Sequence, residues 1–297
     1  MEVIYQTNPS IIKSFIYKKE LDWSALTDGI TLPVRHQMIF GANDGRIMAR
    51  GEKKPVQIIF ESHVYDATII NSNFDKKFNE AHPGDILQIR YKKELKEALI
   101  TAFADSYKYF IEKREIEKRA RTDKRIKLPE DRREYLALYS TGRDDLFFME
   151  AIYTEDMASV AEMTKNKSEE TVEAELNFEL EDNSATIIES TRTAKIRRLN
   201  KKIGDNLKEL YGYRCQICGK MHGEPYACHV VEAHHIIYFV SSLNNDANNQ
   251  LIVCPNHHRI IHKTNPRWDQ RKLAYTYPNG FIEGLSLNYH LSAAQNV

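Results

Sequence analysis

The chain has 297 residues, which is enough for two compact domains that each bury a core. Lys plus Arg and Asp plus Glu are both 42, so the formal net charge is zero and argues against a protein that holds nucleic acid by overall charge. Because no apolar run approaches the roughly 18 residues of a membrane span and no signal-peptide pattern is found, we expect a soluble cytoplasmic protein with no membrane partner.

The first part of the chain is expected to change from a helix to strands. Apolar side chains at near-helical spacing predict a short amphipathic helix over residues 8–22. Residues 30–91 then predict a small β-rich unit. Its expected strands are short runs rich in β-branched residues, with a turn at Pro83-Gly84 before the last of them: 56–60, 63–70 and 85–91.

Helical periodicity returns over residues 92–120, where apolar side chains form one stripe. The charged segment that follows, over 113–133, is interpreted as a solvated helix face with ion pairs four residues apart rather than as a DNA-binding patch. A helix after Pro129 and a strand over 146–153 complete the expected first domain, residues 1–153. We predict that this domain recognises DNA, by analogy alone.

A composition change marks the expected linker, residues 154–190. Residues 155–182 hold ten acidic side chains against two lysines, and a short helix is expected around 169–178. The second domain, 191–297, opens with a basic amphipathic helix that ends near Leu210. Residues 192–214 hold eight basic side chains against two acidic ones, so a locally basic face is expected there.

Three of the four cysteines belong to a metal-binding pattern. Cys215 and Cys218 form a C-x-x-C half, and Cys254 with His257 forms a C-x-x-H half. Two residues between ligands allow both side chains to reach one ion, and thiolate with imidazole is the donor set of a structural zinc. The sequence therefore predicts a zinc site made by these four side chains. Cys228 is left over and is interpreted as a small buried strand residue.

Five polar residues in the same stretch are not among the predicted zinc ligands: His234, His235, Asn249, His258 and His262. His258 and His262 are four residues apart on one expected helix, so they share a face. His234 and His235 are adjacent, and adjacent strand residues point to opposite sides unless the strand bends. Glu232 shares the side of His234 and is an alternative ligand or a hydrogen-bond acceptor behind one. A hairpin around Pro278-Asn279-Gly280 follows.

These residues stand in the motifs E-A-H-H-I, N-x-L-I-V-C and C-P-N-H-H-R-x-I-H, and through them residues 191–290 resemble the HNH nucleases of the ββα-metal type, in particular restriction-type and McrA-like enzymes. The resemblance implies that His235 is the general base and that Asn249 orients it. It implies that His258 and His234 bind the catalytic metal. His262 is, by its position, either a further metal or phosphate contact or a histidine that interacts with the dipole at the helix C-terminus. The family more often has a second cysteine where this chain has His257.

The sequence pattern predicts an α+β chain with a mixed β-rich and helical domain first, and the resemblance implies that a zinc-stabilised ββα-metal nuclease domain follows it. We expect a DNA endonuclease that hydrolyses phosphodiester bonds in a restriction or modification-dependent defence role, with structural Zn²⁺ and catalytic Mg²⁺ or Mn²⁺. Its expected partner is double-stranded DNA, cut by a homodimer. The alternative is a zinc-stabilised DNA-binding or regulatory module whose nuclease centre is degenerate.

Overall fold

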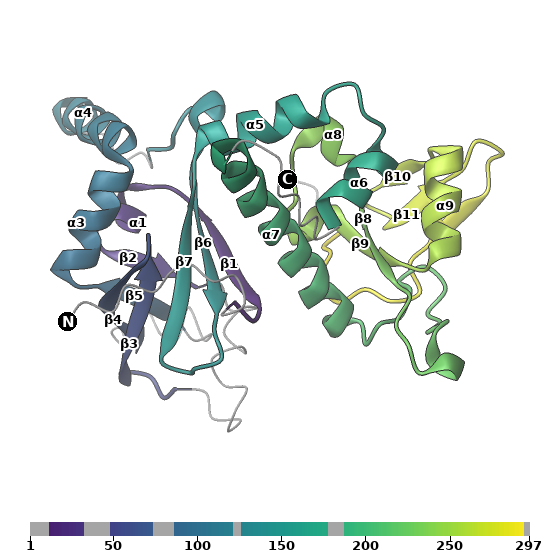
Figure 1. The fold of residues 1–297 in the computed structure, drawn as a ribbon, viewed down its shortest axis with the longest axis horizontal. Coiled ribbons are helices and arrows are strands. Elements are labelled where there is room, and N and C mark those ends of the chain that lie inside the picture. The colour runs from purple at the N-terminus through teal and green to yellow at the C-terminus, as the bar shows by residue number, and fades with distance from the viewer. Residues whose placement is uncertain (1–11, 33–47, 74–85, 121–125, 178–186, 294–297) are drawn as a thin grey trace. The chain divides into compact units, whose positions relative to one another are not determined.

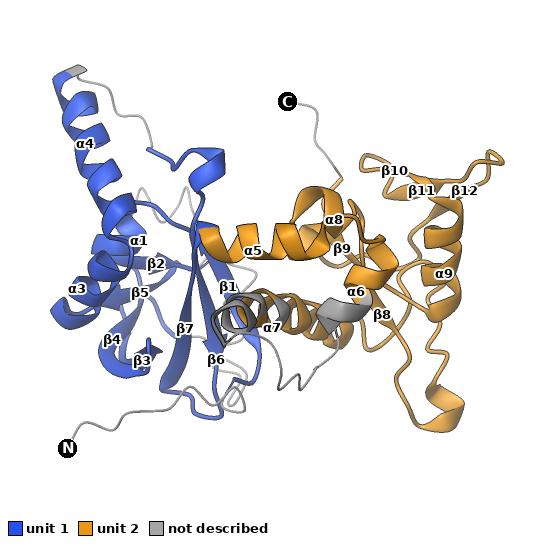
Figure 2. Cartoon of the chain, turned by 45° about the horizontal axis from the view of Figure 1, so that its top comes forward, with its two compact units in different colours: residues 1–154 blue, residues 155–297 orange. Residues whose placement is uncertain are grey.

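A computed structural model describes residues 12–32, 48–73, 86–120, 126–177 and 187–293 (Figure 1). The chain divides into two compact units, residues 1–154 and 155–297 (Figure 2). The division lies next to Tyr153, where the sequence predicted the first domain to end. Both units combine helices with strands, which confirms the predicted α+β class.

The first unit is built around one seven-stranded sheet. Its strands, in spatial order, are β1 (Phe15–Glu20), β6 (Tyr135–Ser140), β7 (Leu146–Ile152), β3 (Lys53–Phe60), β4 (His63–Asn71), β5 (Leu87–Tyr91) and β2 (Gly29–Thr31). The pairing of β3 with β7 is parallel and the other pairings are antiparallel. A tight turn at Glu61 and Ser62, both with positive φ, connects β3 to β4.

The predicted strands at 56–60, 63–70, 85–91 and 146–153 are confirmed as β3, β4, β5 and β7. The predicted helical segment at 92–120 is confirmed as α3 (Lys93–Ala102) and α4 (Ala104–Ala120), separated at Phe103. Together with α1 (Trp23–Thr27), these helices cover the core, in which side chains such as Ile58, Ile89 and Leu99 are fully buried.

Two predictions for the first unit are wrong. Residues 15–20 of the predicted helix are strand β1, because the short apolar run pairs with β6 rather than packing as a helix face. Pro129 is followed by a single 3₁₀ turn, Glu130–Arg132, and then by β6, a strand whose buried residues Leu136–Tyr139 the sequence interpretation missed. Residues 8–11 of the predicted helix and the Pro83-Gly84 turn lie outside the described residues.

The second unit contains helices, short strands and two 3₁₀ turns. In chain order they are α5 (Thr154–Thr164), α6 (Glu169–Asn177), α7 (Ile187–Leu210), η4 (Glu224–Tyr226), β8 (Glu232–His235), α8 (Phe239–Ser242), η5 (Ala247–Asn249), β9 (Gln250–Val253), α9 (Pro255–Thr264), β10 (Arg267–Asp269), β11 (Ala274–Thr276) and β12 (Ile282–Gly284). The predicted basic helix and the predicted hairpin are confirmed as α7 and as β11 with β12.

Much of the predicted linker belongs to the second unit instead. Residues 155–164 and 169–177 are helical, and they bury Val160 and Val172 completely. Asp156 is also buried and accepts a hydrogen bond from Lys195 on α7 at 3.2 Å. An acidic segment with few large apolar residues thus packs through a small number of well-placed side chains. In the described part of the chain no helix is both long and apolar enough to cross a membrane.

Candidate metal centre

Strands β8 and β9 and helix α9 bring the predicted site residues together. The two strands pair antiparallel, with His235 opposite Gln250 and His234 opposite Leu251. All four side chains of β9 are buried, which fixes the pair against the core. Pro255 occupies the first turn of α9, a position where the missing N–H costs nothing, and Asn265 ends the helix in the left-handed conformation.

The first cluster is a cysteine–histidine tetrad, Cys215, Cys218, Cys254 and His257. Its four ligand atoms all lie within 4.8 Å of one another. The Nδ1 atom of His257 is 3.1 Å from Sγ of Cys254 and 3.5 Å from Sγ of Cys215. Ligands about 2.0–2.3 Å from one tetrahedral ion stand roughly 3.3–3.8 Å apart. The two distances lie in or close to this range, so the tetrad could hold a metal ion.

A carboxylate supports the tetrad from outside. The Nε2 atom of His257 faces Oε1 of Glu283 on β12 at 3.4 Å, a contact that fixes which ring nitrogen points to the sulfur atoms. Cys228 takes no part. It is exposed in a loop rather than buried in a strand as the sequence predicted.

The second cluster is a histidine–glutamate cluster, Glu173, His234, His258 and His262, whose ligand atoms also lie within 4.8 Å of one another. His258 and His262 occupy one face of α9, as predicted, and their Nε2 atoms are 3.2 Å apart. Oε2 of Glu173 lies 2.7 Å from Nε2 of His258 and 3.0 Å from Nε2 of His262. The structure thus brings the three predicted metal-ligand histidines together and adds a carboxylate.

His234 is the least satisfied member of this cluster. Its side chain is 0% exposed, and neither ring nitrogen has a hydrogen-bond partner. The nearest charged atom is Oε1 of Glu173, 3.5 Å from Nδ1. A buried polar group without a partner costs about 1–3 kcal/mol, so the position favours a bound group that accepts a nitrogen lone pair.

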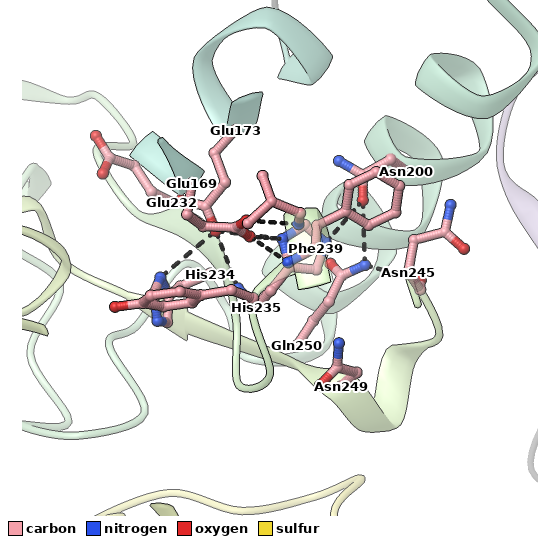
Figure 3. Close-up of polar contacts among 12 residues, drawn as sticks. Glu169, Glu173, Asn200, Glu232, His234, His235, Phe239, Asn245, Asn249 and Gln250 are labelled. Carbon is pink, nitrogen blue, oxygen red and sulfur yellow. Dashed lines mark hydrogen bonds and ion pairs between the residues drawn. The ribbon is translucent and has the colours of Figure 1, made fainter. Parts of the chain in front are cut away.

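His235 lies beside the cluster and is enclosed on both sides (Figure 3). Its Nδ1 atom is 3.2 Å from Oε1 of both Glu169 and Glu173, and its Nε2 atom is 3.2 Å from Oδ1 of Asn200. The side chain is 3% exposed. A general base presents a free ring nitrogen to water, and in this arrangement His235 presents none.

Asn249 does not hydrogen-bond to His235 in the structure. Its Oδ1 accepts from the N–H of Ile237 at 2.9 Å, and its Nδ2 donates to the carbonyls of Ile237 at 2.9 Å and Asn244 at 2.7 Å. The residue therefore closes the loop between β8 and β9. The predicted orienting contact to the His235 ring is made instead by Asn200 and the two glutamates.

The sequence interpretation missed three residues at the site: Glu169, Glu173 and Asn200. Asn200 reaches His235 from α7, which lies close to β8 at Gly204, where an added Cβ would stand 3.1 Å from that of Ala233. Both glutamates lie on α6, within the segment interpreted as a linker. The available signals were weak: a polar residue inside the apolar stripe of α7, and two acidic residues four apart beside Val172.

Burial and the carboxylates set the charges of the cluster. Burial raises the pKa of Glu173, but its close contacts with the four surrounding histidines hold it well below its usual range. Burial lowers the pKa of His234 and outweighs the opposing effect of Glu173. For His258 burial also disfavours the charged ring, yet Glu173 and Glu232 raise its pKa to about 9. For His235 burial opposes the charged ring as well, but Glu169 and Glu173 raise the pKa.

Comparison with protein-family models, with curated proteins and with solved structures finds no match for this chain. The arrangement of its side chains is therefore the evidence from which a function is inferred.

Proposed function

We propose that the chain is a metal-dependent DNA endonuclease of the HNH type, with the metal held by His234, His258 and His262. The observation that carries the proposal is His234, a fully buried imidazole with no hydrogen-bond partner, directed at two further imidazoles on α9. A strand pair followed by a helix supplies these side chains in the order that the resemblance implies.

The cysteine–histidine tetrad is proposed to hold a structural Zn²⁺. Three sulfur donors and one imidazole nitrogen are the donors that zinc prefers, and four of them close its coordination shell. His257, a tetrad member, stands next to His258 on α9. Zinc binding would therefore also fix the first turn of the helix that carries the reactive cluster.

The residues of the histidine–glutamate cluster would serve phosphodiester hydrolysis. A divalent cation bound there supplies positive charge to the developing phosphorane and acidifies a bound water. The three histidines hold it through neutral ring nitrogens. Glu232 contacts Nδ1 of His258 at 2.8 Å, which leaves Nε2 of that ring directed into the cluster.

His235 is the proposed acceptor of the proton from the attacking water, a role implied by the resemblance. The ring can fill this role only at a nitrogen that its present partners, Asn200 or the two glutamates, release. Substitution by alanine would then abolish cutting while leaving cation binding nearly intact. A His235→Ala protein that cuts at the wild-type rate would show that the base is another group.

The DNA-binding surface and the assembly are part of the same proposal. Helix α7 contributes lysines, although Lys195 pairs with Asp156 and both Lys201 and Lys208 pair with Asp205. We therefore assign sequence choice to the first unit and cutting to the second. One centre hydrolyses one strand, so a double-strand break would need a second chain related by a two-fold axis.

Cutting of supercoiled plasmid tests the proposal directly. The full-length protein is incubated with DNA and Mn²⁺ or Mg²⁺, with and without a chelator, and nicked and linear products are measured. Cation-dependent nicking that His258→Ala loses supports the proposal. The matched control is His229→Ala, because His229 stacks on Tyr213 and belongs to neither cluster. Absence of cation-dependent cutting on unmodified, methylated and hydroxymethylated DNA would overturn it.

One observation favours the second candidate, a zinc-stabilised DNA-binding module without activity. Both nitrogens of His235 face oxygen atoms, and Glu173 fills the space between the histidines. A protein that binds DNA and zinc but cuts no substrate under any divalent cation would establish this alternative.

A further inference from the structure

We propose that Glu173 is a direct ligand of the cation, so that the centre has three imidazole nitrogens and one carboxylate oxygen and selects a first-row transition ion over Mg²⁺. The inference builds on the proposed function because it concerns the same centre. It is nevertheless a statement about cation binding, and it can be tested whether or not the protein cuts DNA.

Two of the three distances around Glu173 fall in the range expected between ligands of one ion, and the third, to His258, is shorter. Ligands about 2.1 Å from a common ion stand about 3.0–3.4 Å apart. Oε2 of Glu173 is 2.7 Å from Nε2 of His258 and 3.0 Å from Nε2 of His262, and these nitrogens are 3.2 Å from each other. The carboxylate itself is 3% exposed, so water does not compete for it.

An ion-pair cluster without metal is the competing explanation, and two features weigh against it. Two ring nitrogens on one helix face stand 3.2 Å apart and face the same carboxylate oxygen, an arrangement in which one shared cation accepts both lone pairs. His234 offers the second feature. Its Nδ1 atom lies 3.5 Å from Oε1 of the same carboxylate, and both of its buried ring nitrogens are without a hydrogen-bond partner.

The position of Glu173 is fixed by contacts that do not involve the cation. Its Oε1 atom accepts a hydrogen bond from the backbone N–H of His235 at 3.1 Å. One turn earlier on α6, Glu169 accepts from the N–H groups of Phe239 at 2.6 Å and Val240 at 2.8 Å, one on each carboxylate oxygen. Glu169 thus anchors α6 to the start of α8, and Glu173 is left to face the histidines.

These bonds favour the histidine–glutamate cluster over a second possible cation group, Glu169, Glu173 and His235, whose ligand atoms also lie within 4.8 Å of one another. Both oxygens of Glu169 are already satisfied by backbone donors, and the ring of His235 is held from both sides. The carboxylate of Glu173 therefore serves two partners. One oxygen faces the cation position, and the other holds His235.

The donor set indicates the class of ion. Mg²⁺ prefers oxygen ligands and retains several waters. Imidazole nitrogen binds Co²⁺, Ni²⁺ and Zn²⁺ more strongly than Mn²⁺, and it binds each of these four ions more strongly than Mg²⁺. An ion that takes six ligands keeps two positions beyond the four protein donors, and phosphate oxygen and water can fill them. A four-coordinate Zn²⁺ would have no position left for phosphate oxygen or water.

Binding of Mn²⁺ to the zinc-loaded full-length protein tests the assignment. The electron paramagnetic resonance signal of free Mn²⁺ reports the bound fraction, and the tetrad, already occupied by zinc, does not take up this ion. We expect one Mn²⁺ per chain, retained in a hundredfold excess of Mg²⁺. Glu173→Gln should weaken Mn²⁺ binding at least about tenfold. Even the loss of a residue that only hydrogen-bonds to a metal ligand lowers metal affinity about ten- to a hundredfold. Glu170→Gln, on the exposed side of the same helix, should bind as the wild type does.

The rise in melting temperature caused by Mn²⁺ provides a second measurement, because an ion that binds only the folded protein stabilises it. The rise should be lost in Glu173→Gln and partly retained in Glu173→Asp, which keeps the charge. Wild-type Mn²⁺ affinity in Glu173→Gln would overturn the assignment, and so would faster DNA cutting by that variant, which would show that the carboxylate competes with phosphate. A wild-type protein that binds Mn²⁺ through Glu173 but does not cut would leave the assignment intact and refute the proposed function.

Discussion

The two metal-type clusters of the second unit share helix α9 but differ in how they are built. The cysteine–histidine tetrad draws two ligands from one short loop and two from the start of α9, each pair with two residues between ligands, and it contains no carboxylate. The histidine–glutamate cluster takes His234 from β8, two histidines from α9 and Glu173 from a helix far upstream. The first arrangement is closed by local chain geometry. The second exists only when α6 packs against the rest of the unit.

Under the proposed function, this difference would separate a stabilising role from a reactive one. Four soft or borderline donors satisfy a zinc ion and leave no position for substrate. Three imidazoles with a carboxylate leave positions open on a six-coordinate ion, and the presence of α6 determines whether the set is complete. His257 and His258 are adjacent, so loss of the tetrad should also disturb the second cluster, whereas the reverse should not hold.

The largest effect is expected from removal of a tetrad ligand. Cys215→Ser should abolish zinc retention and unfold the second unit, because a structural zinc can supply on the order of 10 kcal/mol towards folding. Metal analysis together with limited proteolysis of residues 191–290 measures this. Cys228→Ser is the matched control, since Cys228 is exposed and outside the tetrad. Unchanged melting and zinc content in Cys215→Ser would contradict the structural role.

A ligand of the second cluster should behave differently. His262→Ala should lower Mn²⁺ affinity at least about tenfold, and cutting with it, because one of four donors is lost. Its melting temperature without Mn²⁺ should stay close to that of the wild type, since zinc still holds the unit. Part of the cutting should return at high Mn²⁺. Unfolding comparable to that of Cys215→Ser would show that the two clusters are not separable.

The contrast between the clusters also explains what the sequence could predict. The tetrad is visible because short spacings such as Cys215 to Cys218 force two side chains together whatever the rest of the chain does. The pairing of His258 with His262 is equally local, since residues four apart share a helix face. Most strands of the first unit are predictable for a similar reason: their β-branched runs are bounded by turn residues.

Features that depend on distant packing were missed. Glu173 is one acidic residue among many in its segment, and only the docking of α6 directs it at the histidines. The run from Phe15 to Glu20 is too short for its period to distinguish helix from strand, and its pairing with β6 decides the outcome. Asn249 was expected to orient His235, but backbone groups of Ile237 in the same loop take both ends of its amide.

The role of Asn249 gives a third prediction, intermediate in size. Asn249→Ala removes three hydrogen bonds from a buried loop anchor, so we expect a loss of about 2 kcal/mol in the free energy of unfolding. Denaturant titration of the zinc-loaded protein measures it. Asn248→Ala, at an exposed neighbouring position, should change stability little. A stable Asn249→Ala protein that no longer cuts would instead support the role implied by the resemblance.

The smallest effects are expected from substitution of the carboxylates that contact a ligand histidine of each cluster. Because each cluster has one such carboxylate, the two substitutions compare the clusters directly. Glu232 contacts Nδ1 of His258 at 2.8 Å, and Glu283 contacts Nε2 of His257 at 3.4 Å. Glu232→Gln should weaken Mn²⁺ binding about tenfold or less, at the low end for an orienting partner because its side chain is 47% exposed. Glu283→Gln should leave Mn²⁺ affinity unchanged and only speed zinc loss to a chelator. If Glu283→Gln weakened Mn²⁺ binding as much as Glu232→Gln does, then helix α9 would couple the two centres, and their division into a structural and a reactive cluster would not hold.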